Sequence, residues 1–436
     1  MAELRKKHKT WIKEFLTPNL VENQKLITCK NPKEHIEIEA IEIKEMSLEV
    51  AFMLTVCYFV KISIKIRTEH EQCEGEDGYD ETLFDIVVKF APDVEPDLYE
   101  IWGMQEKFGN EITTYEHIAP KIESLSKSPK CLYSHNEPSD AVIVLSDFSN
   151  DGWKMSKLKV NLPLDHIIVA VKELGRFHGQ MYALKLTDAD AFQSMKSRLL
   201  NSRFGEVTDE WNICLELGIR RATYSVRTSI ESREIVPETF LKRLEEVMYG
   251  VYDYLGKRNR PIEPIAIICH GDYLRNNIAF RYDVDGKAIE AMMFDFQTMC
   301  YSSPMIDLTT FIANSTGWKV RNKHFSEIFS AYHESLIGSF IQASKWEESK
   351  IPEYLKYDNM LKEYACYLPF GLGIASAFLQ FLHDKETPNF EQKSPIKETI
   401  RFALDKGGDV VDAELRALVV DIYQLHDKLD LNLEKL

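Results

Sequence analysis

One stretch of the chain decides its fold: Cys-His-Gly-Asp-Tyr-Leu-Arg-Asn-Asn at 269–277, Phe-Asp-Phe-Gln at 294–297 and Ser-Ser-Pro-Met-Ile-Asp-Leu at 302–308. Short apolar segments connect these polar motifs. Residues 265–269, 278–282 and 288–294 each have the length and composition of a short buried strand. Asp-Gly at 285–286 is a strong hairpin signal between the last two segments. The stretch therefore predicts a strand, a polar loop and a β-hairpin.

The hairpin fixes which polar residues meet. With residues 285–286 as the two turn residues, Asn277 lies opposite Phe294, and Asp295 lies opposite Asn276. Asn277 and Asp295 therefore meet at the open end of the hairpin, beside the loop that carries Asp272.

An amide and two carboxylates at one point form an oxygen-rich site. Mg²⁺ prefers oxygen ligands and commonly bridges nucleotide phosphates. Asp272 precedes Asn277 by the interval of the kinase catalytic loop, Asp-x-x-x-x-Asn, in which the Asp accepts the proton of the substrate hydroxyl. We predict Asp272 as a catalytic base and Asn277 and Asp295 as Mg²⁺ ligands. A surface hairpin with ordinary turn residues is the alternative, which the complete constellation disfavours.

Composition limits the partners of the chain. Its 436 residues suffice for a large bilobal unit with an ample core. The formal net charge is −16, which opposes binding of nucleic acid or of an anionic membrane. An anionic nucleotide such as ATP would need Mg²⁺ and local basic groups.

The chain also lacks the usual signs of export. Its eight cysteines show no paired spacing of the zinc-ligand or redox type, which fits reduced thiols. Residues 1–13 are charged and contain no apolar signal segment. The apolar run at 50–60 is too short to span a membrane. We expect a cytoplasmic protein without a membrane contact; the oligomeric state is left open.

The first third of the chain alternates in the manner of strands. Alternating isoleucines at 36–43 slip at Ala40, which predicts a bulge. Further strands are predicted at 50–60, 62–66, 83–90 and 141–145, with one amphipathic helix at 108–122 and a helical segment in the first thirty residues.

The sequence pattern changes from strand-like to helix-like at a turn-rich segment, 146–152. Beyond it, helices are predicted at 165–185, 239–255, 325–343, 354–383 and 412–433. The prediction is an α+β fold with an N-terminal lobe at 1–145, a hinge at 146–152 and a mainly helical lobe at 153–436.

Two charged residues occupy apolar positions in the N-terminal lobe. Lys89 lies inside the apolar strand, and Glu111 lies at the edge of the apolar face of the helix. Buried charges are costly unless they are paired. Kinases use such a Lys–Glu pair to hold the α and β phosphates of the nucleotide. Two separate surface charges are the alternative.

Two histidines could be catalytic but fit structural roles better. His178 shares an apolar helix face, where a core histidine is the commoner case. His270 is expected to anchor the catalytic loop by hydrogen bonds, which leaves Asp272 as the base.

The motifs at 269–277, 294–297 and 302–308 resemble those of the insect ecdysteroid kinase-like family, within the wider choline kinase and aminoglycoside phosphotransferase group. The resemblance extends to Val-Val-Lys-Phe-Ala-Pro at 87–92, Phe-Gly-Asn-Glu-Ile-Thr-Thr-Tyr-Glu at 108–116, Val-Leu-Ser-Asp-Phe at 144–148 and Leu-Gly-Arg-Phe-His-Gly at 174–179. It covers about residues 35 to 420. It implies a protein-kinase-like fold and ATP-dependent phosphorylation of a small-molecule hydroxyl.

The resemblance also implies roles for single residues. Lys89 would bind phosphates with Glu111 as its partner, and Asp307 would brace the catalytic loop. Backbone groups at the hinge would contact adenine; the residues are Ser146, Asp147 and Phe148. For Asp272 the resemblance implies the role of catalytic base, and for Asn277 and Asp295 it implies the role of Mg²⁺ ligands, as predicted above.

Two positions depart from the family pattern. The segment 44–50, where the phosphate-covering loop is expected, contains no glycine, which predicts weaker binding of ATP. Ser146 stands where the family more often has an acid. The acceptor implied is an ecdysteroid or another lipophilic alcohol. A choline-like or aminoglycoside-like cationic acceptor, or a pseudokinase that only binds ligands, are the alternatives.

Overall fold

A computed structural model describes residues 2–26, 34–46, 55–68, 79–158, 160–383 and 395–433. The chain forms two compact units. The first comprises residues 1–100 and 129–152, and the second comprises residues 101–128 and 153–436. Most of the segment 44–50 and most of the acidic segment 71–81 lie outside the described residues.

The first unit contains an antiparallel five-stranded sheet in the order β1-β2-β3-β5-β4. Alternate residues of β2, from Tyr58 to Ile64, are buried, as the period of two requires. The predicted bulge is present, because the pairing of β1 with β2 shifts between Ile38 and Ala40. The strands are β1 Glu34–Glu45, β2 Val56–Thr68, β3 Tyr79–Phe90, β4 Cys131–Glu137 and β5 Asp140–Ser146.

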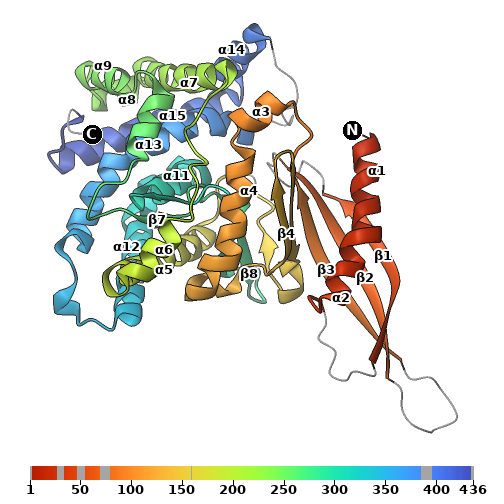
Figure 1. Ribbon diagram of the computed structural model, residues 1–436. Helices are drawn as coiled ribbons and strands as arrows, with labels where there is room; N and C mark the ends of the chain where they lie inside the picture. Colours follow the sequence, from red (N-terminus) through yellow and green to blue (C-terminus); the bar gives the residue numbers. More distant parts are fainter. Residues whose placement is uncertain are drawn as a thin grey trace. The chain divides into compact units, whose positions relative to one another are not determined.

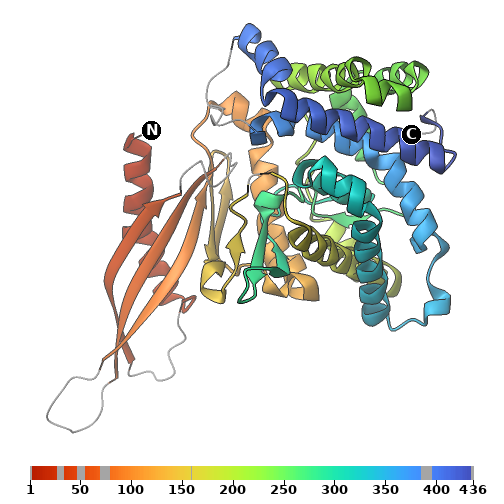
Figure 2. The same cartoon turned by 180° about the vertical axis from the view of Figure 1, so that it is seen from behind.

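An N-terminal helical segment lies along one face of this sheet (Figures 1 and 2). It consists of α1 Ala2–Trp11, a π-helical turn at Ile12–Leu16 and α2 Thr17–Glu22. Ile12, Leu16 and Leu20 are fully buried in the apolar core of the first unit. Burial of each such side chain contributes about 2 kcal/mol. The helix thus covers the face of the sheet that alternation leaves apolar.

The predicted helix at 108–122 belongs to the second unit, not to the predicted lobe at 1–145. The side chain of Asn110 is fully buried, and its Nδ2 donates to Leu200 O at 3.0 Å. Thr114 and Met299 are also in contact. Hydrogen bonds between residues so far apart in the sequence cannot be predicted from local periodicity. The elements are α3 Pro96–Ile101, α4 Met104–Thr113, a π-turn at Thr114–Ile118 and 3₁₀ turns at Ala119–Lys121 and Glu123–Lys127.

The rest of the second unit is mainly helical, as predicted. Its helices are α5 Leu164–Thr187, α6 Ala189–Lys196, α7 Asp209–Thr228, α8 Ile230–Ile235, α9 Glu238–Val247, α10 Val251–Arg258, α11 Met305–Ser315, α12 Trp318–Ser344, α13 Tyr357–His383, α14 Ile396–Asp405 and α15 Gly408–Lys428. Helix α7 was not among the predicted helices. The single helix predicted at 239–255 is two helices, because Gly250 between them has a φ of 68°.

Two small antiparallel sheets hold the polar motifs of the second unit. One pairs β10 Cys300–Ser302 with β7 Ile267–Cys269, and the other has the order β6-β8-β9. The strands of the latter are β6 Lys154–Met155, β8 Ile278–Tyr282 and β9 Ala288–Met293. The α+β class predicted from the sequence is therefore confirmed.

Helices α5 and α12 lie side by side and pack very closely (Figure 1). A Cβ on Gly175 would lie 2.4 Å from Tyr332 O, and a Cβ on Gly179 would lie 2.2 Å from Leu336 O. Only glycine permits this approach, which brings His178 of α5 within reach of α12.

Helix α13 has the length and apolar composition of a membrane-spanning helix. Most of its apolar window is buried inside the structure, which is typical of a core helix. Helix α13 is thus part of the core of the second unit.

Candidate active site

The hairpin β8–β9 has the predicted register at its open end. Ile278 pairs with Met293, and Phe294 N donates to Asn277 O at 3.1 Å. The turn end differs from a two-residue turn, because the register shifts between Arg281 and Tyr282. There the carboxylate of Asp283 accepts two backbone amides and closes a longer turn. The open end, which carries the polar residues, is unaffected.

Asn277 is hydrogen-bonded to Asp272 within the loop that follows β7. Its Nδ2 donates to Asp272 Oδ2 at 3.0 Å and to Asp272 O at 2.8 Å. A 3₁₀ turn at Arg275–Asn277 produces this closure, with Asn277 N donating to Leu274 O. The side-chain oxygen of Asn277 accepts from Asn276 Nδ2 at 2.9 Å. The amide and the carboxylate are therefore held together by the loop itself.

Asp295 adopts a left-handed backbone conformation, with a φ of 64°. This conformation is uncommon outside glycine, although Asp and Asn tolerate it best. Strained residues of this kind cluster at functional sites. Asp295 directly follows Phe294, whose amide donates to Asn277 O, and the charge of Asp295 acts on Asp272. The three predicted residues thus lie together in the second unit.

The donor set of this cluster fits Mg²⁺. It offers two carboxylates and one amide oxygen, all hard ligands, from Asp272, Asn277 and Asp295. It contains no thiol or imidazole ligand, which zinc would favour. Asn277 and Asp295 are the residues that would hold the ion, beside Asp272.

The carboxyl group of Asp272 has a raised pKa. Burial is the main cause, and the charge of Asp295 adds to it. The charges of Arg203 and His270 and the hydrogen bond from Asn277 oppose the increase. A raised pKa brings a carboxylate nearer to the pH at which a general base is most effective.

Asp307 holds the backbone of the loop before Asp272 by accepting two of its amides. Its two carboxylate oxygens accept His270 N and Gly271 N, each at 2.8 Å. His270 also joins Asp272 N through Nδ1 at 3.3 Å and Phe294 O through Nε2 at 3.0 Å. The loop and the end of β9 are therefore connected through one imidazole ring.

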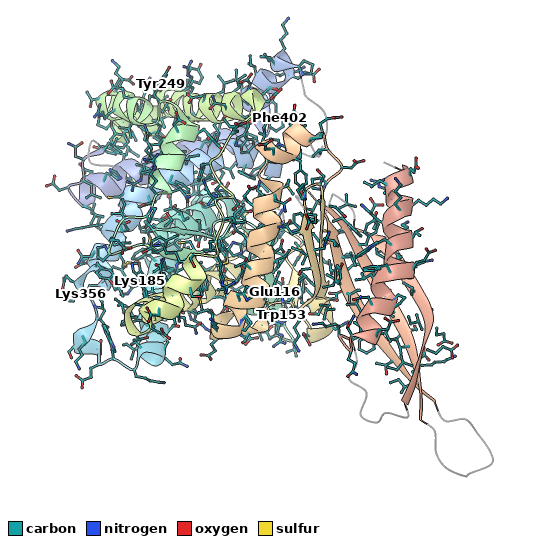
Figure 3. All side chains as sticks on the ribbon, viewed as in Figure 1. Glu116, Trp153, Lys185, Tyr249, Lys356 and Phe402 are labelled. Atoms are coloured by element: carbon teal, nitrogen blue, oxygen red, sulfur yellow. The ribbon has the colours of Figure 1, made fainter. Side chains whose placement is uncertain are left out.

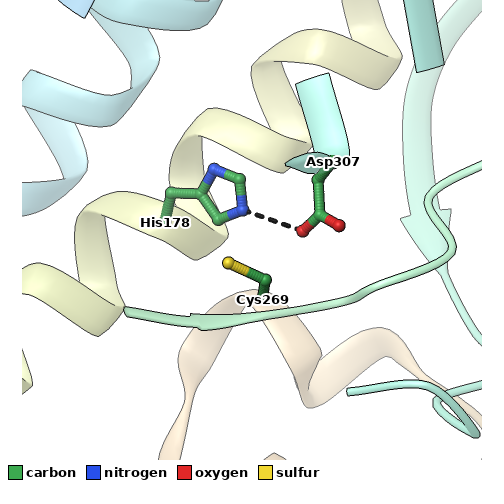
Figure 4. A group of neighbouring side chains, drawn as sticks. All are labelled: His178, Cys269 and Asp307. Atoms are coloured by element: carbon green, nitrogen blue, oxygen red, sulfur yellow. Dashed lines mark hydrogen bonds and ion pairs between the residues drawn. The ribbon is translucent and has the colours of Figure 1, made fainter. Parts of the chain in front are cut away.

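His178, Cys269 and Asp307 form a fully buried cluster whose ligand atoms lie within 4.8 Å of one another (Figure 4). His178 Nε2 lies 3.2 Å from Asp307 Oδ2, and its Nδ1 lies 2.8 Å from the hydroxyl of Tyr332. Burial raises the pKa of the Cys269 thiol far above its usual value. Because the Asp307 carboxylate also accepts two backbone amides, we interpret the cluster as a brace for the loop before Asp272.

Two cations near Asp272 were missed by sequence reasoning. Lys107 of α4 interacts electrostatically with Asp272 and Asp295, and Arg203 interacts with Asp272. Lys107 lies one helical turn before Glu111, so its position on α4 was a usable signal. Arg203 lies in the connection from α6 to α7, where no pattern in the sequence marked it.

Lys89 and Glu111 are both buried, each in its own unit. Lys89 lies in β3 between Cys57 of β2 and Ile143 of β5. Glu111 lies in the last turn of α4. The pairing of the two residues stays a prediction.

Two backbone amides of the predicted hinge are already hydrogen-bonded within the first unit. Ser146 N donates to Lys130 O, and Asp147 N donates to Asp85 O, each at 3.0 Å. The carboxylate of Asp147 caps the 3₁₀ turn Phe148–Asp151 by accepting from Ser149 N at 2.8 Å. An adenine contact at this segment would have to use groups other than these two amides.

A cavity of about 970 Å³ lies elsewhere in the second unit, on helices α7, α9, α14 and α15. Its wall includes Arg220, Arg221, Asp412 and the exposed Tyr249, which Figure 3 labels. None of the predicted site residues lines it. The cluster of Asp272, Asn277 and Asp295 is therefore distinct from this cavity.

Solved structures match the chain only at low sequence identity. An ethanolamine kinase of Plasmodium vivax matches with a TM-score of 0.37 at 13% identity, over 89% of this chain and 84% of that chain. The GDP and kanamycin complex of APH(2'')-IIia matches with a TM-score of 0.38 at 10% identity, over 90% and 97% of the two chains. Both TM-scores lie below 0.5, so neither match assigns the chain.

No curated protein sequence matches the chain. The profile of the ecdysteroid kinase-like family matches residues 51–343, which is more than half of the sequence and includes Lys89, Glu111, Asp272, Asn277, Asp295 and Asp307. The chain belongs to the ecdysteroid kinase-like family.

Proposed function

We propose that this protein transfers the γ-phosphoryl group of ATP to a hydroxyl group of a small molecule. The observation that carries the proposal is the bond between Asn277 and the carboxylate of Asp272, beside Asp295 in its left-handed conformation. Membership of a kinase-like family supports phosphotransfer as the reaction class. Catalysis of this kind depends mainly on positioning and electrostatics.

Each residue of the cluster has one task in this proposal. Asp272 orients the acceptor hydroxyl and takes its proton, for which its raised pKa suits it. Asn277 and Asp295 hold Mg²⁺, which when bound neutralises phosphate charge. Lys89 positions the α and β phosphates with the help of Glu111. Asp307 and His270 keep the loop in place.

We propose a lipophilic alcohol of the steroid type, such as an ecdysteroid, as the acceptor. Family membership supports this choice. Most aromatic residues that could line a lipophilic pocket belong to the core, since they are almost fully buried; they include Trp153, Phe177, Tyr182, Phe192, Tyr364, Tyr367 and Phe370. Phe204 and Tyr252 are only half-buried and contact each other, and Phe204 also contacts Arg203, so this pair is the better candidate for a pocket wall.

Incubation with Mg-ATP and a panel of acceptors tests the proposal. The panel contains steroids, sterols, glycosides, choline and aminoglycosides, and mass spectrometry detects an added phosphoryl group. We expect a phosphorylated steroid-like alcohol, with a KM for the acceptor that changes little with salt because apolar burial dominates. Efficient turnover of choline or aminoglycosides, with none of steroids, would reject the acceptor class.

A thermal-shift titration with Mg-ATP separates an enzyme from a pseudokinase. Stabilisation by Mg-ATP together with phosphorylation of an acceptor supports the enzyme. Stabilisation without any transfer to the panel favours a binding module. No stabilisation at millimolar Mg-ATP contradicts the nucleotide site itself.

A further inference from the structure

Two cations flank the catalytic carboxylates within the second unit. Arg203 acts electrostatically on Asp272 and on Lys107, and Lys107 acts on both Asp272 and Asp295. Glu106 also acts on Lys107, so two positive groups interact here with three carboxylates. Two positive side chains here would attract phosphate charge, although the chain as a whole has a net charge of −16.

Asn110 fixes the two cations relative to each other. Leu200 N donates to Asn110 Oδ1 at 2.7 Å, and Asn110 Nδ2 lies 3.0 Å from Leu200 O and from Ser202 Oγ. Asn110 is fully buried in α4, three residues after Lys107. The segment that ends at Arg203 is thus bonded to the helix that carries Lys107.

The guanidinium group of Arg203 lies against two aromatic rings and is hydrogen-bonded to Cys300. Its Cζ lies 4.9 Å from the ring centre of Phe204 and 6.0 Å from that of Phe370, within the range of cation–π contacts. Its Nη1 is buried and has no hydrogen-bond partner among the residues that the structure describes. A buried charged donor without a partner costs more than about 1 to 3 kcal/mol. A ligand that accepts this hydrogen bond would remove the penalty.

We propose that Arg203 and Lys107 bind the transferred phosphoryl group beside Asp272. This inference rests on the proposed function. In the transfer step the acceptor oxygen forms a bond to the γ-phosphorus of ATP and its proton passes to Asp272. The bond from the γ-phosphorus to the bridging oxygen breaks, and its electron pair leaves with ADP. Negative charge on the oxygens of the moving group is met by the two cations.

A simpler role for Arg203 is to keep Asp272 ionised. Both roles place the guanidinium near the carboxylate, but they differ in what Arg203 does to a phosphoryl mimic. If Arg203 is only a counter-ion of Asp272, replacing Arg203 leaves binding of the mimic unchanged and shifts the pH dependence of turnover. A phosphoryl-binding residue contributes to binding of the mimic directly.

Binding of Mg-ADP with and without aluminium fluoride distinguishes the two roles, because fluoroaluminate mimics the phosphoryl group in transfer. Calorimetry on the full chain measures the affinity gain that fluoroaluminate adds. We expect Arg203→Ala to lower this gain on the order of 100-fold, the size found for one lost transition-state donor. Its affinity for Mg-ADP alone should stay within about threefold of the original protein.

Arg198→Ala is the matched control. Arg198 lies in the same connection, is exposed, and its replacement removes the same charge. It should keep the full fluoroaluminate gain. Arg203→Gln, which keeps the length of the side chain over Phe204, is the second variant if Arg203→Ala does not fold, and it should also lose the gain. Lys107→Met should lower the gain as well.

The outcomes separate this inference from the function on which it rests. If the original protein shows the gain and Arg203→Ala or Arg203→Gln keeps it, the inference is wrong while nucleotide binding stands. A protein that binds Mg-ADP without any gain also rejects the inference. Failure of the original protein to bind Mg-ADP at all rejects both.

Discussion

Asp307 accepts the backbone amide of His270 at 2.8 Å, across 37 residues of sequence. The same carboxylate accepts the next amide, that of Gly271, and receives the imidazole of His178 at 3.2 Å. Burial alone would raise the pKa of Asp307, but its hydrogen bond with His178 and the nearby charges lower the pKa below its usual value. The carboxylate is therefore an anion that holds the backbone immediately before Asp272.

This brace predicts that Gly271→Ala destabilises the protein strongly. Gly271 has a φ of +85°, and a Cβ there would lie 1.9 Å from Thr298 O. Strain and a backbone clash together should cost on the order of 3 kcal/mol or more in free energy of unfolding. Gly286→Ala is the control, since Gly286 has a φ of +79° but nothing within 4 Å of its Cβ. It should cost about 1 kcal/mol. Equal losses in urea unfolding would contradict the role of the close approach.

Asp272→Asn should lower turnover by about two orders of magnitude or more, the range for loss of a general base. The amide keeps the shape of the side chain, so Mg-ATP should still bind. Turnover of an identified acceptor and calorimetry with Mg-ATP measure the two effects. Near-normal turnover would disprove the assignment of the base.

Asp295→Ala should weaken Mg²⁺-dependent nucleotide binding more than Asn277→Ala, because Asp295 supplies charge and Asn277 a neutral oxygen. Asn277→Ala should have a second effect, since its amide also bonds the carboxylate of Asp272 at 3.0 Å. We expect Asn277→Ala to lower kcat beyond its effect on nucleotide affinity. Titration of nucleotide with and without Mg²⁺ measures the loss of affinity in each variant. A larger loss in Asn277→Ala than in Asp295→Ala would contradict the assigned roles.

Local structure around the candidate site could be predicted from the sequence, whereas contacts between distant segments could not. Hairpin pairing is a local rule, so the register that joins Asn277 to Phe294 followed from the turn alone. The bulge at Ala40 followed from alternation in the same way. The position of Arg203 depends on Asn110, which lies ninety residues from Leu200. A contact of that range leaves no periodic signal, and the assignment of α4 to the second unit was missed for the same reason.

Lys89→Ala should weaken binding of ATP. Lys89 is buried in β3. Without glycine at 44–50, side chains should keep the backbone amides farther from the phosphates, which leaves more of the binding to the lysine. Lys61→Ala is the control. Lys61 is exposed in the neighbouring strand β2, and its replacement removes the same charge. Unchanged affinity for ATP in Lys89→Ala would count against the phosphate role of the lysine.

Glu173→Gln should stabilise the protein at pH 8 and have little effect at pH 5. Glu173 is buried in α5, and its Oε1 has no hydrogen-bond partner among the described residues. Burial raises its pKa from 4.5 to about 7, despite the opposing charges of Arg176 and Lys127. Because the folded state holds this proton more tightly than the unfolded state, stability is highest below pH 4.5 and falls as the pH rises to about 7.

Above that window the ionised carboxylate destabilises the fold by about 3 kcal/mol as an upper figure, since each pKa unit corresponds to about 1.4 kcal/mol. Glu173→Gln removes this penalty, so its gain in free energy of unfolding should grow between pH 5 and pH 8. Glu334→Gln on α12 is the control, because Glu334 is exposed and its replacement should give no pH-dependent gain. Urea unfolding across this pH range measures both variants. A gain for Glu173→Gln that is the same at pH 5 and pH 8 would show that its carboxylate is not the source of the penalty.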